Sequence, residues 1–357
     1  MNSFIISVDS SFQMTNNFFE ILMEEPYVLQ QEVVIIVDGN DSYILREYLK
    51  NLVSKHENIR LFFCDKVGYG IANNIAVEKS KGDILFFINT DIFASSKCFE
   101  KIENAIIQHK GDCIQPLLLY PQSNLVQCAG TFFGNYFKNH LFDGNKPNAS
   151  IVAFSDQRQA LTSALYAMKK DIFEYIGGFD PFYFNKLESF ELSYKLTLSG
   201  KKCFYLAEAS AYHSRGGGRS HYSFDFTQQE AYFWSRYGSS VKSDIHVYLQ
   251  KQLDIEMQKH SYYALLLNQH RDWYRILEKL PIELGQTSEF PWINLNSLNL
   301  FDLLPNAILN NKTPILFIVD NIKLLRANYY WFKLRDNPLD IAMDNYANLI
   351  NIKDYLS

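Results

Sequence analysis

Short apolar runs alternate with amphipathic helical patterns over the first 110 residues, and this alternation limits the possible folds more than any other feature. The runs are FIISV, VVIIV, IRLFFC and ILFFI, at residues 4–8, 33–37, 59–64 and 84–88. Helical patterns follow or separate them, as at residues 43–53, 70–80 and 96–109. Strands with apolar residues on both faces are typical of buried parallel sheets. The segment therefore predicts βαβ units and an α/β fold with a doubly wound, mostly parallel sheet.

Polar residues follow three of these predicted strands. Asp38 ends the second run, the loop 68–74 follows the third, and Asn89-Thr90-Asp91 follows the fourth. Ligands of doubly wound sheets bind beyond the carboxyl ends of the strands. We therefore expect the three features to lie at one edge of the sheet and to form a candidate site.

The rest of the chain has a different pattern. Strand-like runs mix with short helices from about residue 112 to 240, and the segment from about 244 to 280 has mainly helical spacing. At about 150 residues per domain, 357 residues suggest two domains. We place the first domain at 1–240 and a mainly helical C-terminal domain, of unknown role, at 241–357. The net charge of −5 argues against a broad surface for nucleic acid.

Cysteine usage and the apolar segments bear on the cellular compartment. The five cysteines are dispersed and form no CxxC pair, which is typical of a reducing compartment. The N-terminal residues lack the basic region of a signal peptide, and no window approaches 18 uninterrupted apolar residues. We therefore expect a cytoplasmic protein, at most peripherally attached to the inner face of the cell membrane.

The segment VGYGIANN, at 67–74, has two interpretations. Gly68-x-Gly70 between a strand and a helix is part of a dinucleotide-binding fingerprint, and Asp91 stands about 20 residues further on. However, Asn73 occupies the position of the third glycine, and the strand is the third of the series rather than the first. A tight turn that packs a helix on a sheet explains the glycines equally well. An NAD(P)-dependent oxidoreductase therefore stays an alternative hypothesis.

Two further motifs are weak when taken alone. INTD, at 88–91, brings a carboxylate to the end of a strand, where it could bind Mg²⁺ or Mn²⁺. His213 is a single histidine in AYHSRGGG, and the loop 214–220 carries two arginines that could contact an anionic group. A strand cap, a structural histidine and a surface loop are the commoner explanations.

Taken in chain order, these segments resemble family 2 glycosyltransferases with the GT-A fold, in particular rhamnosyltransferase-like enzymes of bacterial surface polysaccharide synthesis. The resemblance covers roughly residues 1–220. Its segments are VVIIVDGNDS, VGYGIANNIAVEKSKGDILFFINTD, the ungapped IGGFDPFYFNKLESFEL, and AYHSRGGG. The second and third segments are moderately specific, and the order and spacing of all four strengthen the resemblance.

The resemblance implies inverting transfer of a sugar from a UDP- or dTDP-sugar donor to a hydroxyl group of a glycan or lipid-linked glycan acceptor. The implied nucleotide-sugar contacts are Asp9, Asp38, Gly68, Asn74, Asn89, Thr90 and Asp91. The implied acceptor-side residues are Gly178, Phe179, Asp180 and Ser189. Asp91 and His213 would hold Mn²⁺ or Mg²⁺, which would neutralise charge on the departing diphosphate.

The catalytic base is where the chain departs from the family pattern. The family has two successive acids, usually with the second as base, and this chain has Glu188-Ser189. We prefer Glu188 as the base, with Glu191 as the alternative. Ser189 also suits a helix N-cap, and the helix dipole favours Glu191 in the first turn regardless of catalysis. A non-catalytic nucleotide-sugar-binding or scaffold protein is the third interpretation.

Near the C-terminus, the segment 312–335 interleaves basic residues with aromatic ones. Such a pattern could rest on an anionic membrane surface, where a lipid-linked acceptor would be found. We favour the alternative in which the apolar residues form a core or contacts between subunits of a homo-oligomer, and the basic residues are solvated. The sequence does not identify the sugar, the acceptor or the oligomeric state.

Overall fold

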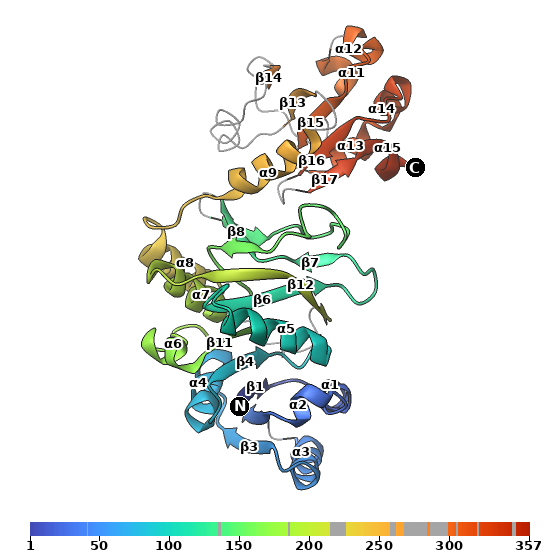
Figure 1. Cartoon of the computed structure of the whole chain (residues 1–357). Helices are drawn as coiled ribbons and strands as arrows, with labels where there is room; N and C mark the ends of the chain where they lie inside the picture. Colours follow the sequence, from blue (N-terminus) through green and yellow to red (C-terminus); the bar gives the residue numbers. More distant parts are fainter. Residues whose placement is uncertain are drawn as a thin grey trace. The chain divides into compact units, whose positions relative to one another are not determined.

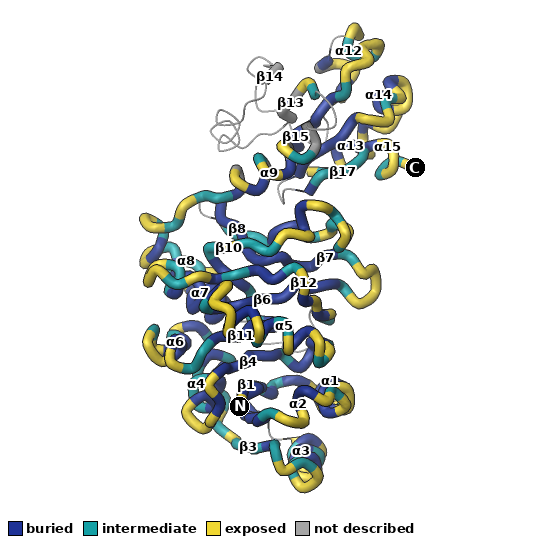
Figure 2. Tube along the Cα trace, viewed as in Figure 1, coloured by how far each residue is buried: buried dark blue, intermediate teal, exposed yellow. Residues whose placement is uncertain are grey.

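The computed structural model describes residues 1–40, 42–134, 137–184, 186–214, 226–257, 262–267, 284–285, 299–304, 306–319, 321–344 and 348–357. The chain forms two compact units (Figures 1 and 2). The first contains Met1–Leu141 and Lys146–Val241, and the second contains Phe142–Asn145 and Lys242–Ser357. Among the described residues, no helix is long and apolar enough to cross a lipid bilayer.

A ten-stranded mixed sheet forms the centre of the first unit (Figure 1). Its strands are β1 (Asn2–Val8), β2 (Glu32–Asp38), β3 (Ile59–Cys64), β4 (Ile84–Ile88), β5 (Ile92–Phe93), β6 (Cys113–Leu119), β7 (Val126–Cys128), β10 (Asp156–Arg158), β11 (Leu165–Lys169) and β12 (Cys203–His213). The main order is β10-β12-β6-β11-β4-β1-β2-β3, with β5 paired to β12 and β7 paired to β6. A separate hairpin joins β8 (Thr131–Gly134) to β9 (Phe137–His140).

Helices cover both faces of this sheet. They are α1 (Phe12–Leu22), α2 (Pro26–Leu29), α3 (Tyr43–Lys55), α4 (Tyr69–Lys79), α5 (Ser96–Ile107), α6 (Lys170–Tyr175), α7 (Glu188–Leu198) and α8 (Phe226–Tyr237). In β1, Phe4 and Ile6 join the core that includes α1, α3 and α5, whereas Ile5 joins the core that includes α4, α6 and α7. Because successive side chains point to opposite faces, a strand covered on both faces must be apolar throughout.

The first unit confirms the predicted α/β class and the doubly wound sheet. Strands β3, β2, β1 and β4 are parallel to one another, as expected from the four apolar runs. The antiparallel pairings of β11, β10, β5 and β7 all involve the region after residue 91, mostly where the sequence pattern changes. Because β1, β2 and β4 are parallel, Asp9, Asp38 and Asp91 follow strands that end at the same edge of the sheet.

The second unit combines helices with a five-stranded sheet of order β14-β13-β15-β16-β17. Its strands are β13 (Tyr263–Leu267), β14 (Leu284–Gly285), β15 (Ile315–Val319), β16 (Ile341–Met343) and β17 (Leu349–Asn351). Its helices are α9 (Ile245–Met257), α11 (Leu300–Leu303), α12 (Asn306–Asn310), α13 (Lys323–Ala327), α14 (Tyr329–Arg335) and α15 (Ile352–Leu356). The helices were expected, but the sheet was not. The run YALLL in β13 fell within the mainly helical stretch, because periodicity cannot separate a short buried strand from a buried helix.

The basic and aromatic segment near the C-terminus divides between core and surface. Trp331 and Phe332 are buried against Phe317, whereas Tyr330 is exposed. Arg335 is also buried, and its Nε lies 2.5 Å from Oδ2 of Asp340. Much of the segment therefore serves the core of the second unit, as we favoured for its apolar residues. The expectation that the basic residues are solvated is wrong for Arg335, which burial with Asp340 explains.

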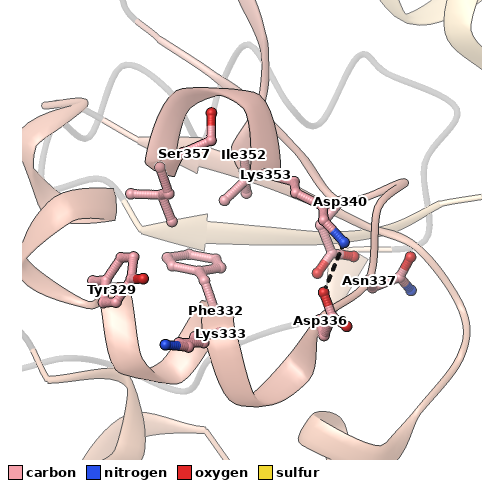
Figure 3. Close-up of a pocket in the computed structure, with 10 residues that line it drawn as sticks. Tyr329, Phe332, Lys333, Asp336, Asn337, Asp340, Ile352, Lys353 and Ser357 are labelled. Carbon is pink, nitrogen blue, oxygen red and sulfur yellow. Dashed lines mark hydrogen bonds and ion pairs between the residues drawn. The ribbon is translucent and has the colours of Figure 1, made fainter.

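A pocket of about 220 Å³ lies between α14 and α15 within the second unit (Figure 3). The rings of Tyr329 and Phe332 form part of its wall, and Lys353 pairs with Asp336 at 2.9 Å on another side. It contains none of the residues that the sequence predicted for the site.

Candidate functional site

The structure brings Asp91 and His213 together. Strand β5 pairs antiparallel with the end of β12 so that Ile92 lies opposite His213, and the backbone N–H of Ser214 donates to the carbonyl of Asp91 at 2.9 Å. The pairing places Nε2 of His213 3.3 Å from Oδ1 of Asp91. Two residues that are far apart in the sequence, and weak as separate motifs, therefore meet at the edge of the sheet.

The surroundings of Asp91 suit a divalent cation. Asp91 is 7% exposed, and its Oδ1 is buried and accepts no hydrogen bond from the described residues. Oδ1 of Asn89, in the same turn, is likewise buried without a donor among them. Oxygen atoms of this kind, with an imidazole nitrogen, are ligands that Mn²⁺ and Mg²⁺ accept. The described residues contain no cluster of three or more His, Cys, Asp or Glu side chains. Substrate phosphates and water would therefore complete the coordination.

Asp38 and Asp9 share a lysine that was not predicted. The carboxylate of Asp38 accepts hydrogen bonds from the backbone N–H groups of Val67 and Gly68 at 2.7 and 3.1 Å. Lys66 Nζ lies 3.1 Å from Asp38 and 2.5 Å from Asp9. The Asp38 side chain is 1% exposed and that of Asp9 is 23% exposed. Asp38 thus shapes the loop that leads into α4, while Asp9 is the more accessible of the two acids.

Thr90 and Asn74 make contacts that join separate segments of the site. Oγ1 of Thr90 lies 2.9 Å from Oγ of Ser10, which links the end of β4 to the end of β1. Asn74 forms two hydrogen bonds with the backbone of Phe179: its Nδ2 donates to the carbonyl at 2.9 Å, and its Oδ1 accepts from the N–H at 3.0 Å. Asn74 therefore connects α4 to the GGFD segment, residues 177–180.

The glycines of the possible dinucleotide fingerprint contact the same part of the chain. Gly68 has a positive φ of 85°, and an added Cβ would lie 2.3 Å from the carbonyl oxygen of Phe184. A Cβ on Gly70 would lie 3.1 Å from Phe179 and 3.6 Å from Glu188. Both glycines therefore allow the 179–188 segment to approach α4 closely, which agrees with the packing interpretation of VGYGIANN.

Helix α7 begins at Glu188, two residues earlier than it would if Ser189 were its N-cap. Leu187 precedes the helix in the left-handed conformation, with φ of 72°, and the first turn already includes Glu188 and the buried Ser189. An N-cap residue has extended rather than helical dihedral angles. The predicted capping role of Ser189 is therefore wrong, and both Glu188 and Glu191 lie in the first turn.

The two glutamates of this turn have different surroundings. Glu188 is 6% exposed and lies beside Gly70 of α4. Burial raises the pKa of the Tyr69 phenol well above its usual value, and the negative charges of Glu188 and Asp91 raise it further. The two carboxylates therefore lie close enough to the same hydroxyl group for both charges to affect its pKa. Glu191 is fully buried and accepts a hydrogen bond from Tyr237 at 2.5 Å. Its Oε2 lies 3.6 Å from Lys195 Nζ, and burial raises its pKa.

Comparison with known proteins shows what part of this chain is similar to. Residues 20–159 match the model of the family described as Glycosyl transferase family 2. This part of the chain is therefore similar to family 2 glycosyltransferases. An uncharacterized glycosyltransferase of Haemophilus influenzae is 32% identical over 79 residues, which are 22% of this chain and 31% of that protein. The chain thus matches less than a third of that relative.

Solved structures have also been compared with the fold of this chain. The crystal structure of GalNAc-T7 with UDP, GalNAc and Mn²⁺ superposes with a TM-score of 0.51 at 17% identity, over 60% of this chain and 43% of that chain. The Pyrobaculum calidifontis mannosyltransferase PcManGT with GDP-Man and Mn²⁺ gives a TM-score of 0.48 at 11% identity, over 68% and 65% of the two chains. The first similarity establishes the GT-A fold.

In the first unit, α8 holds Asp180, which the resemblance predicts on the acceptor side. The carboxylate lies 2.6 Å from Arg236 and 3.4 Å from the hydroxyl of Tyr232. Because Tyr237 of the same helix binds Glu191, α8 contacts both the GGFD segment and the first turn of α7. The arginine-bearing loop predicted to contact an anionic group lies, beyond Ser214, outside the described residues.

Gln127 and Lys66 are site residues that the sequence did not reveal. Gln127 is fully buried on β7, and its Nε2 donates to the carbonyl of His213 at 3.0 Å while its Oε1 contacts Nδ1 of the ring. The link depends on the pairing of β7 with β6 and of β6 with β12. No local motif marks Gln127 in LVQCAG, whereas Lys66 could have been considered because it follows a strand and precedes Gly68.

Gly177 and Gly178 provide a test of the GGFD contact. Both have positive φ values, 79° and 65°, but a Cβ on Gly177 would meet nothing within 4 Å, whereas one on Gly178 would lie 2.7 Å from Oδ1 of Asn74. Gly177→Ala is expected to lower the free energy of unfolding by about 1–2 kcal/mol, the cost of a left-handed conformation. Gly178→Ala should cost more, because it also displaces Asn74. Urea unfolding of both variants measures the difference, and equal losses would contradict the contact.

Proposed function

We propose that the chain is an inverting, metal-dependent glycosyltransferase that moves a sugar from a UDP- or dTDP-sugar to a hydroxyl group of a growing bacterial surface glycan or glycoconjugate. One observation carries the proposal above all others: Nε2 of His213 lies 3.3 Å from a buried oxygen of Asp91 that has no hydrogen-bond donor among the described residues. Glu188 supplies a carboxylate in the same region. The family 2 domain supports the class of reaction.

Asp91 and His213 would hold Mn²⁺ or Mg²⁺, with the amide oxygen of Asn89 as a further candidate ligand. The bound cation supplies electrostatic stabilisation of the diphosphate leaving group. The similar GalNAc-T7 structure contains Mn²⁺ together with UDP, which is consistent with this assignment. The chain's own contribution is to keep two ligands in place before the donor arrives.

Glu188 would act as the general base. The acceptor hydroxyl oxygen attacks the anomeric carbon of the donor, the bond from that carbon to the diphosphate oxygen breaks, and the hydroxyl proton passes to the Glu188 carboxylate. Attack opposite the leaving group inverts the anomeric configuration. Glu191 is less suited to this role because Tyr237 and Lys195 already contact its two oxygen atoms.

The nucleotide would lie along the ends of β1 and β2. Asp9 is the candidate for direct contact because its side chain is more exposed than that of Asp38. Asp38, Gly68 and Asn74 would act indirectly, since each holds the loop before α4 or the GGFD segment. On the acceptor side, the path by which the acceptor reaches Glu188 would be lined by Gly178, Phe179 and Asp180.

Residues 1–240 would contain this chemistry, and the C-terminal domain would serve the acceptor or the membrane that carries it. We propose a cytoplasmic location with peripheral membrane contact through exposed residues such as Tyr330. A homo-oligomer is compatible with these contacts.

The non-catalytic alternative rests on Ser189 alone. The NAD(P)-dependent alternative is disfavoured by the family match and by Gly68 and Gly70, which contact the 179–188 segment.

The proposal is tested with the purified full chain and a panel of UDP- and dTDP-sugars. We expect a donor to bind in calorimetry with Mn²⁺ or Mg²⁺ present, and its binding to be lost when EDTA is added. In the presence of metal, NMR should show slow release of the nucleotide and a free sugar of inverted anomeric configuration. Absence of binding across the panel with metal present would contradict the proposal, and NAD(P) that raised Tm instead would favour the oxidoreductase.

A further inference from the structure

We propose that Gln127 is the positioning residue that fixes the ring of His213 as the tautomer with a proton on Nδ1, so that the lone pair of Nε2 faces Asp91. The inference deepens the proposed function and depends on it for the role of the cation. It starts from contacts on two paired strands at the sheet edge. Gln127 is fully buried on β7, and its amide meets both the backbone and the ring of His213.

The two contacts determine the orientation of the Gln127 amide. One atom of the amide lies 3.0 Å from the carbonyl oxygen of His213, which can only accept a hydrogen bond. That atom must therefore be the donor Nε2, and the acceptor Oε1 is left facing Nδ1 of the ring. A carbonyl oxygen of an amide has no proton to give, so Nδ1 must carry the proton of this hydrogen bond.

The orientation has a consequence on the other side of the ring. In a neutral imidazole with Nδ1 protonated, Nε2 presents a lone pair. Here Nε2 lies 3.3 Å from Oδ1 of Asp91, which is buried and has no donor among the described residues. A lone pair and a carboxylate oxygen at this distance are a pair of acceptors that one cation can join. Gln127 therefore prepares an N,O pair for a metal ion, in the way that residues behind a metal-binding histidine orient its ring.

Gln127 also fixes the main chain at His213. Because the same amide binds the His213 carbonyl, the end of β12 and the ring cannot turn independently of each other. The hydrogen bond from the backbone N–H of Ser214 to the carbonyl of Asp91 joins the next residue of the chain to the other predicted ligand. A substitution at Gln127 should therefore alter metal binding without any direct contact with the metal.

The ring of His213 can be tested directly in the metal-free full chain. We expect long-range ¹H–¹⁵N spectra of ¹⁵N-histidine-labelled protein to show Nδ1 protonated and Nε2 unprotonated, with the signals assigned by their loss in His213→Asn. Gln127→Leu should remove this preference and weaken Mn²⁺ binding, measured by electron paramagnetic resonance, by about 10–100-fold. Gln127→Glu still accepts from Nδ1 and should keep the tautomer, with a smaller loss of affinity.

Gln115 provides a matched control. It is also fully buried, on the neighbouring strand β6, but its Oε1 accepts from the N–H of Thr162 at 2.8 Å. Gln115→Leu should therefore leave the His213 signals and the Mn²⁺ affinity unchanged. An Nε2-protonated or doubly protonated ring in the wild-type chain would overturn the proposal, as would equal losses of affinity in Gln115→Leu and Gln127→Leu. The spectra require neither a donor nor enzymatic activity. A failed sugar-transfer assay would therefore contradict the proposed function without affecting this test of the His213 tautomer.

Discussion

Glu188→Gln is expected to lower kcat for sugar transfer by about 10²–10⁴-fold, the usual contribution of a positioned general base. Gln has nearly the same shape as Glu but cannot take a proton from the acceptor hydroxyl. Because Glu188 lies at the start of α7 and not among the residues predicted to hold the nucleotide, the affinity for the donor should change little. Steady-state kinetics and donor calorimetry on the same preparation separate the two effects.

Glu191→Gln is the matched control for this experiment, since Glu191 lies in the same helical turn. Its Oε1 accepts a hydrogen bond from Tyr237, and the amide oxygen of Gln can still accept it. We therefore expect a much smaller change in kcat than for Glu188→Gln. If Glu191→Gln were inactive and Glu188→Gln active, Glu191 would be the base. A wild-type chain that binds donor but never transfers the sugar would favour the non-catalytic interpretation.

The parallel half of the sheet could be predicted because its physical signal is local. Strands β1, β2 and β4 are covered by helices on both faces, so they appear in the sequence as mainly apolar runs, whereas the edge strand β3 is half-buried and includes Arg60. The second unit shows the limit of that signal. Strand β13 is only Tyr263–Leu267, and a run of this length is compatible with either a buried strand or a helix until its neighbours β14 and β15 are known.

The site shows a similar division between local and distant information. Asp91 and His213 were predicted because a family resemblance supplied the pairing that their spacing does not. The roles of Asn74 and Gln127 depend on hydrogen bonds to residues more than 80 positions away, such as Phe179 and His213. The error at Ser189 has a different origin. A serine before an apolar turn is a good N-cap, but the left-handed Leu187 takes that position and the helix starts two residues earlier.

Asp91→Asn should abolish the metal-dependent binding of the donor, so that adding Mn²⁺ no longer strengthens binding. The substitution removes the charge of one predicted ligand, and we expect kcat/KM for transfer to fall by about 10²–10³-fold, the scale of a lost electrostatic contact in a transition state. In the wild-type chain Mn²⁺ should raise Tm, because a ligand that binds only the folded state stabilises it. In Asp91→Asn this shift should disappear. Without metal, the variant should be at least as stable as the wild type, since it no longer buries a carboxylate oxygen that lacks a donor among the described residues.

Asp83→Asn is the control for this effect, because Asp83 is exposed and immediately precedes the other end of β4. It makes the same chemical change next to the same strand, at the end opposite to Asp91. Thermal melts with and without Mn²⁺ should therefore show a wild-type shift for Asp83→Asn and none for Asp91→Asn. A metal-induced shift that survives in Asp91→Asn would place the cation elsewhere. If both variants lost the Tm shift equally, the shift would reflect the overall negative charge of the protein and not a metal ligand at the end of β4.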